Sequence, residues 1–275
     1  MSIPDLHIPQ ALLTADARGV RVVAHTDGFD IPEAERLVVL FGSRPAGVTC
    51  PFAHFAYPFG KTHVAVVTVA DRPDGALGFR FLILNRELYR NLGDPFAIAD
   101  RFPPDWNAKG NLPSLTWPQE PLPIRRVEQL QELLKAGDAP LLLGSTQALV
   151  DEGRVVLKRS APDEAFLRGL WQLLPDRTRS ELWPASFAFS DELGFHAAIL
   201  PELPSDTTRV RHTEEGLRSY PQSRYELNLQ IAIEAGDQRE VERLFARRTS
   251  NDTIRLGLTI IALALVLAAI SKFLL

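Results

Sequence analysis

Residues 63–84, HVAVVTVADRPDGALGFRFLIL, decide the fold of this chain. The two ends of the stretch, 63–69 and 78–84, are rich in the β-branched and aromatic residues that favour strands. Between them, DRPDG at 71–75 has the composition of a turn, in which Gly75 can adopt a positive φ. The stretch therefore predicts an antiparallel β-hairpin.

On either side of this hairpin, the first half of the chain alternates between strand patterns and helix patterns. Residues 20–25 read as a strand, and 33–40 as a helix that begins after Asp30 and ends at Gly42. After the hairpin, Asn85 is placed to cap a helix over 86–92, and Asp94 to cap a second helix over 95–100.

The second half begins with a segment, 102–124, whose prolines forbid regular structure and whose tryptophans are too apolar for a free linker. We expect it to be an ordered crossover on the surface of the fold. Beyond it the pattern predicts helices over 125–135, 141–150 and 164–174, and strands over 154–158, 186–190 and 195–200, the last two joined as a pair through 191–194. These patterns fit α+β or α/β, depending on the order of the strands, and the expected fold class is α+β, a mixed sheet with helices.

The expected domain organisation follows from these patterns. Residues 1–200 form one α+β domain, with an alternative division into subdomains 1–102 and 125–200; residues 201–223 form a linker, 224–248 a helical hairpin and 254–275 a transmembrane anchor. Within the hairpin, Gly236 ends the first helix, and Asp237 with Glu240 forms a capping box for the second.

The anchor is predicted from residues 256–270, LGLTIIALALVLAAI, which carry no charge. A helix over 256–275 would span about 30 Å, the thickness of the hydrocarbon core of a bilayer. The apolar side chains that would face lipid are Leu256, Leu258, Ile260, Ile261, Leu263, Leu265, Leu267 and Ile270. We therefore expect a single-pass, tail-anchored membrane protein with the lipid bilayer as one partner. An alternative makes this stretch one helix of a hetero-oligomeric membrane complex.

The charge distribution and the cysteine content indicate where the protein is located and which classes of partner it could bind. Several arginines precede the apolar run and only Lys272 lies near its end, so the positive-inside rule places the N-terminal domain in the cytoplasm. The first residues show no signal peptide, and the single Cys50 fits a reducing compartment. A net charge of −4 with scattered arginines argues against nucleic acid as a partner.

No motif assembles a catalytic site. Gly60-Lys61-Thr62 resembles the end of a phosphate-binding loop, but position 55 is Phe where that loop needs Gly, so we interpret it as a turn. The histidines show no metal-binding spacing, and we expect neither a metal nor a cofactor.

Two sets of residues are candidates for a site. Cys50 with His25, His54 or His63 would give a nucleophile and a base if the early strands brought them together, as in a membrane-associated hydrolase. Asp71, Arg72 and Asp74 form a charged loop tip that is a candidate for ligand binding. For both sets the plainer interpretation is polar residues on exposed faces and a solvated loop, so enzymatic activity is left open, with catalysis the less favoured option.

The order of the segments along this chain resembles the order found in a known protein family. The run from the hairpin into LNRELYRNLGDPFAIADRFPPDW (84–106), together with LWQLLPDRTRSELWPASFAF (170–189), is similar to the N-terminal domain of bacterial GTPase-associated proteins. The resemblance covers about residues 18–200. The family pattern has a histidine in the second hairpin strand, where this chain reads FRFLIL.

The resemblance implies a recognition or scaffold role beside GTPases and signalling adaptors in bacterial conflict systems, without GTP binding by this chain. Combined with the anchor, it predicts a cytoplasmic recognition domain held at a membrane, with a protein partner such as a GTPase or an adaptor. The membrane-associated hydrolase is the alternative.

Overall fold

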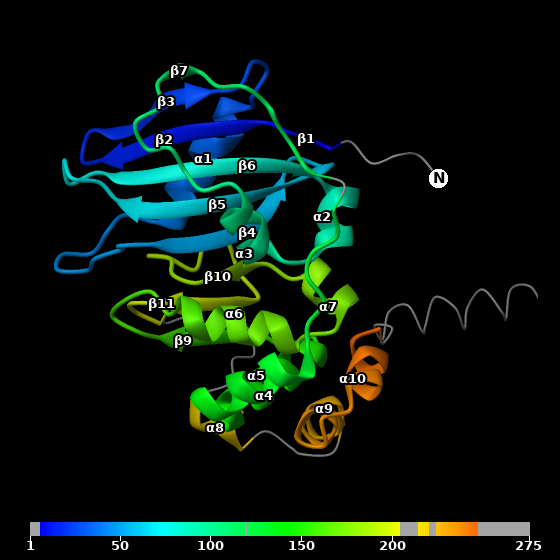
Figure 1. Ribbon diagram of the computed structural model, residues 1–275. Coiled ribbons are helices and arrows are strands. Elements are labelled where there is room, and N and C mark those ends of the chain that lie inside the picture. The colour runs from blue at the N-terminus through cyan, green and yellow to red at the C-terminus, as the bar shows by residue number, and fades with distance from the viewer. Residues whose placement is uncertain (1–5, 119, 204–213, 220–223, 247–275) are drawn as a thin grey trace, which may run out of the picture.

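The computed structural model describes residues 6–118, 120–203, 214–219 and 224–246. Its centre is a mixed sheet of nine strands from these residues, in the order β7-β3-β2-β6-β5-β4-β10-β11-β9, with helices packed against it (Figure 1). The pairs from β3 to β10 are antiparallel, whereas β7–β3, β10–β11 and β11–β9 are parallel. The fold is α+β with a mixed sheet and several helices, as the sequence predicts.

The bounds of the described elements are as follows. The strands are β1 His7–Ile8, β2 Gln10–Asp16, β3 Gly19–His25, β4 Ala53–Phe59, β5 His63–Asp71, β6 Leu77–Asn85, β7 Gly110–Asn111, β8 Leu115–Thr116, β9 Val155–Lys158, β10 Pro184–Ala185 and β11 Ala197–Leu200. The helices are α1 Ile31–Phe41, α2 Arg86–Leu92, α3 Pro95–Arg101, α4 Val127–Ala136, α5 Ala139–Val150, α6 Glu164–Leu173, α7 Asp176–Glu181, α8 Glu214–Arg218, α9 Tyr225–Glu234 and α10 Gln238–Phe245.

The predicted hairpin is confirmed as the antiparallel pair β5–β6. Its register runs from His63 opposite Asn85 to Asp71 opposite Leu77, and Gly75 in the turn has a φ of +83°. Both strands are buried along nearly their whole length, because further strands pair on either side and helices cover the faces.

The two strands that flank this hairpin, β2 and β4, are not among the predicted elements. In β4, Pro58 argues against a strand because proline cannot donate to the ladder. The structure tolerates it because β10 pairs with β4 only at Phe55, so the outer edge of β4 is unpaired at Pro58.

Two apolar clusters cover the opposite faces of the sheet. One contains Leu37 and Phe41 of α1 with Phe79 and Phe81 of β6. The other contains Leu88 and Tyr89 of α2 and Ile98 of α3 with the alternate strand residues, including Leu82, Leu84, Val64 and Val66. Figure 1 shows α1 behind the sheet, with α2, α3 and the proline-rich segment in front.

The predicted strand pair over 186–190 and 195–200 is wrong in its length and its direction. β10 comprises only Pro184–Ala185, and it runs parallel to β11. The chain then leaves the sheet, because the amides of Phe189 and Ser190 both donate to the carbonyl of Phe41 at the end of α1. Through β10 the strands of both halves of the chain form one continuous sheet.

The proline-rich segment is ordered and packed on the fold, as predicted. It contributes β7, which pairs with β3, and β8, which pairs with β1. Trp117 next to β8 is buried in the second cluster, and its backbone amide donates to the carbonyl of Leu6.

Part of the expected linker 201–223 is instead a helix. α8 packs against α5, and Leu217 is buried there. The helical pair α9 and α10 forms as predicted, with Gly236 at a φ of +70° between them and the carboxylate of Asp237 accepting the amide of Glu240 at 3.1 Å.

The predicted membrane segment lies outside the described residues. Every anchor side chain named above, from Leu256 to Ile270, falls there, and the anchor stays a prediction. In the ranges that the structure does describe, no helix combines the length and the apolar character needed to cross a bilayer.

Candidate functional site

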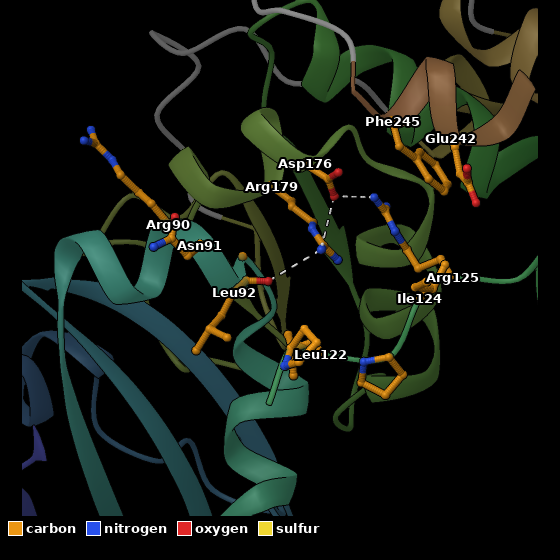
Figure 2. A pocket seen from close by; sticks show the side chains of 13 residues that line it. Arg90, Asn91, Leu92, Leu122, Ile124, Arg125, Asp176, Arg179, Glu242 and Phe245 are labelled. Atoms are coloured by element: carbon orange, nitrogen blue, oxygen red, sulfur yellow. Dashed lines mark hydrogen bonds and ion pairs between the residues drawn. The ribbon is translucent and has the colours of Figure 1, made fainter. Parts of the chain in front are cut away.

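The first candidate is a cleft of about 600 Å³ between α2, α7, α10 and the end of the proline-rich segment (Figure 2). Its lining residues are Arg90, Asn91, Leu92, Gly93, Pro121, Leu122, Pro123, Ile124, Arg125, Asp176, Arg179, Glu242 and Phe245. We call this the Arg125–Arg179 cleft. The two arginines are nearly buried, with side chains 12% and 13% exposed.

Arg125 joins three parts of the fold. Its Nη1 donates to the carbonyls of Gln172 at 3.0 Å and Leu174 at 2.6 Å, which the end of α6 leaves unpaired. Its Nη2 bonds to Asp176 at 2.5 Å, and the guanidinium lies 3.5 Å from the centre of the Phe245 ring of α10. Figure 2 shows Phe245 beside Arg125 and the shared contact with Asp176.

Arg179 lies against the end of α2. Its Nη2 is 3.2 Å from Asp176 and 3.5 Å from the carbonyl of Leu92, and its Nη1 is 3.9 Å from Asp94. Its Nε is buried without a hydrogen-bond partner among the described residues. Gly93 makes room for it, since a Cβ there would lie 3.1 Å from that Nε.

The cleft is close to electrically balanced. Burial, and then the neighbouring Arg179, lower the pKa of Arg125 to about 10, so this guanidinium stays charged near pH 7. They share Asp176, whose side chain is 55% exposed, and Glu242 lies at the rim. Arg90 also lines the cleft, but its side chain extends away from the arginine pair (Figure 2). A ligand in this cleft would therefore be held by directed hydrogen bonds more than by net charge.

One residue that lines the Arg125–Arg179 cleft has an exposed apolar side chain. Ile124 is 72% exposed, more than any other large hydrophobic residue in the described part of the chain. It adjoins Arg125 in sequence, so the cleft offers guanidinium donors on its floor and an apolar contact at its edge. This combination of donors and apolar surface is typical of protein interfaces.

The catalytic candidates are not assembled. His54 lies opposite Thr68 and His63 opposite Phe59, five residues apart along the strands, or about 16 Å. His25 is in β3, four strands from β4 in the sheet order, or about 19 Å. In the described ranges, no hydrogen bond or ion pair joins any two of Cys50, His25, His54 and His63.

Cys50 is in addition a poor nucleophile. It is fully buried, and burial, with the charge of Asp71, raises the pKa of its thiol to about 12. Only the thiolate attacks, and at neutral pH almost none is present. The hydrolase alternative thus finds no support in the geometry.

The structure gives His54 a different neighbour, which the sequence does not indicate. Its Nδ1 lies 3.4 Å from the carboxylate of Glu164 in α6, which also accepts a hydrogen bond from Arg168. The nearby Ser186 hydroxyl accepts the His54 backbone amide at 2.8 Å. All of His54 is buried, so we interpret this network as part of the contact between β4, β10 and α6.

The charged loop tip has structural partners. Asp71 pairs with Arg44 and accepts the Cys50 amide at 2.9 Å. Arg72 donates to the carbonyl of Trp106 at 2.9 Å and lies over its ring, and Asp74 accepts the amide of Ala76 within the turn. These contacts hold the hairpin turn against the proline-rich segment.

Comparison with known proteins does not assign the chain to a family. No protein-family model matches the sequence, and no curated protein is significantly similar to it. In the part of the chain that the structure describes, no group of three or more His, Cys, Asp or Glu side chains is arranged to hold a metal ion.

Proposed function

We propose that this chain is a membrane-tethered recognition domain that docks a segment of a partner protein in the Arg125–Arg179 cleft. The observation that carries the proposal is the exposed Ile124 next to two nearly buried guanidiniums. In this proposal an apolar partner side chain packs on Ile124, and carbonyl or carboxylate oxygens accept hydrogen bonds from the arginines.

The position of α10 would place the cleft near the predicted anchor. Its last residue, Phe245, lines the cleft, and the predicted anchor begins at residue 254. Nine residues of extended chain reach about 30 Å. A tether of that length would keep the cleft close to the bilayer surface and favour a partner that is itself at the membrane. A GTPase or an adaptor is the class of partner that the family resemblance suggests.

Site-specific photo-crosslinking in cells tests the docking proposal. A photoreactive residue at Ile124 of the full chain is expected to capture a discrete protein. The matched control is Val39 in α1, which is 65% exposed and belongs to the helix on the other side of the sheet. Loss of the Ile124 product when Arg179→Met is introduced into the same chain, and its retention with Arg36→Met in α1, would support the cleft. The same products from both positions, or none from Ile124, would contradict it.

A further inference from the structure

A second cavity contains a buried cation without an acidic partner. Arg80 in β6 is only 4% exposed, and its Nη2 donates to the Gln10 side-chain oxygen at 3.0 Å. Gln10 is fixed in this orientation because its amide nitrogen donates to the carbonyl of Pro113 at 2.7 Å. Nη1 of Arg80 is buried and has no hydrogen-bond partner among the described residues. In the same part of the chain, no carboxylate forms an ion pair with Arg80.

An arrangement of this kind is costly for a fold. Transferring a guanidinium from water to an apolar interior is unfavourable unless an anion and hydrogen bonds compensate it. Here burial lowers the pKa of Arg80 to about 10, which still leaves the group charged at neutral pH. Among the residues that the structure describes, a single amide oxygen accepts a hydrogen bond from the Arg80 side chain, so the site can take a further hydrogen-bond acceptor and a negative charge.

The cavity next to Arg80 has the size and the walls of a small-molecule site. It has a volume of about 370 Å³ and lies between β2, β6 and the proline-rich segment. Its walls are mostly apolar; the residues that line it are Gln10, Leu12, Arg80, Arg101, Phe102, Pro103, Asp105, Ala108, Leu112, Pro113 and Leu115. Small-molecule pockets commonly begin at about 300 Å³ and combine apolar walls with a few polar groups.

The other charges in the lining favour a monoanion. Arg101 pairs with Glu120 at 3.0 Å and is half exposed, so it adds little free positive charge. Asp105, whose carboxylate accepts the amide of Asn107, would repel a dianion such as phosphate more than a carboxylate. A carboxylate also matches the planar donor geometry of one guanidinium.

We propose that this cavity binds a small organic carboxylate, with Arg80 as its charge partner and Leu12, Phe102 and Leu112 around its apolar body. The site is separate from the Arg125–Arg179 cleft and shares no lining residue with it. It stands independently of the docking proposal.

Calorimetric titration of the full chain in detergent tests the site with three probes: benzoate, its neutral isostere benzamide, and inorganic phosphate. We expect saturable binding of benzoate with a dissociation constant on the order of 1 mM, as for other ligands of this size. Benzamide is expected to bind about tenfold more weakly, because the charge-assisted hydrogen bond is lost. Phosphate is expected to bind about tenfold more weakly, because Asp105 repels its second charge and it has no apolar body for the walls to contact.

Arg80→Met keeps much of the side-chain volume and removes the charge, and it is expected to weaken benzoate binding about tenfold while leaving benzamide unchanged. Arg36→Met in α1, an exposed arginine outside the cavity, makes the same change in net charge and is expected to have no effect. Should Arg80→Met not fold, Ala108→Trp offers a second test, because it fills the cavity from the proline-rich segment. Benzoate binding that survives either substitution, or that cannot be saturated in the wild type, would overturn the proposal.

Discussion

Arg154 and Asp191 form an ion pair in which each side chain is only 11% exposed. The guanidinium also donates to the carbonyl of Phe195 at 2.8 Å, which ties β9 to the loop before β11. Removing one partner of a buried pair leaves an uncompensated charge. We predict that Asp191→Ala lowers the free energy of unfolding by about 3 kcal/mol in urea titrations.

Two further variants separate this cause from a general loss of contacts. Asp191→Ala combined with Arg154→Met should recover much of the loss, since the unpaired charge is then absent. Lys135→Met removes one partner of an ion pair in which both side chains are at least 70% exposed, and should change stability by less than about 0.5 kcal/mol. A double variant no more stable than Asp191→Ala would contradict the electrostatic explanation.

Glu164 gives stability a pH dependence. Burial alone raises the pKa of this carboxyl, but the hydrogen bond and charge of His54 and the charge of Arg168 outweigh it and leave the pKa below its ordinary value of 4.5. A lowered carboxyl pKa stabilises the fold above the ordinary value, and this contribution is lost as the pH falls through the folded-state pKa. We predict that Glu164→Gln unfolds at a lower urea concentration than the wild type at neutral pH, with a gap that narrows below about pH 4.5.

Glu132→Gln is the matched control variant for Glu164→Gln. Its carboxylate is 76% exposed in an i,i+3 pair with Lys135, so the difference from wild type should stay small at every pH. A Glu164→Gln deficit that is constant from neutral to acid pH would show that the lost stability does not come from the charge.

Helix α2 ends at Gly93, where the backbone has a φ of +63° and Arg179 fills the space beside the α-carbon. Gly60, in the turn between β4 and β5, has nearly the same φ of +61°, with no atom within 4 Å of the position of a Cβ. Alanine at either site pays about 1–2 kcal/mol for the left-handed conformation. We predict that Gly93→Ala is the more destabilising by about 1 kcal/mol, because it also displaces Arg179.

Thermal and urea unfolding of the two alanine variants measure this difference directly. Gly93→Ala should also weaken the crosslink at Ile124, since Arg179 is part of the cleft floor, whereas Gly60→Ala should leave it unchanged. Equal destabilisation by the two variants would mean that Gly93 serves only the backbone of α2.

Helices were predictable where their caps are local. Asp30, Asn85, Asp94 and Asp163 each accept an amide of the following turn, and each precedes a helix that the sequence predicts. Several elements were missed, among them α7 and β4. The short α7 has no apolar stripe of its own, and β4 is a strand in spite of Pro58 because β10 leaves that edge unpaired.

Neither cavity was predictable, because each depends on pairs that are distant in sequence. Arg125 meets Asp176 across 51 residues, and Arg80 meets Gln10 across 70. Sequence patterns show that Arg80 interrupts an apolar strand, but they do not show that it forms no ion pair with a carboxylate in the described part of the chain. The register of β4 against β5 separates His54 from His63, so these two catalytic candidates do not meet in the structure.

Extraction of cell membranes with alkaline carbonate tests the tethered recognition domain most directly. The full chain is predicted to stay in the membrane pellet. Leu263→Lys with Leu265→Lys is predicted to move it to the supernatant, since each central charge costs about 3 kcal/mol in a bilayer. The matched pair Leu263→Ile and Leu265→Ile should remain in the pellet. Release of the unaltered chain into the supernatant, or retention of the double lysine variant in the pellet, would contradict a membrane anchor at residues 254–275.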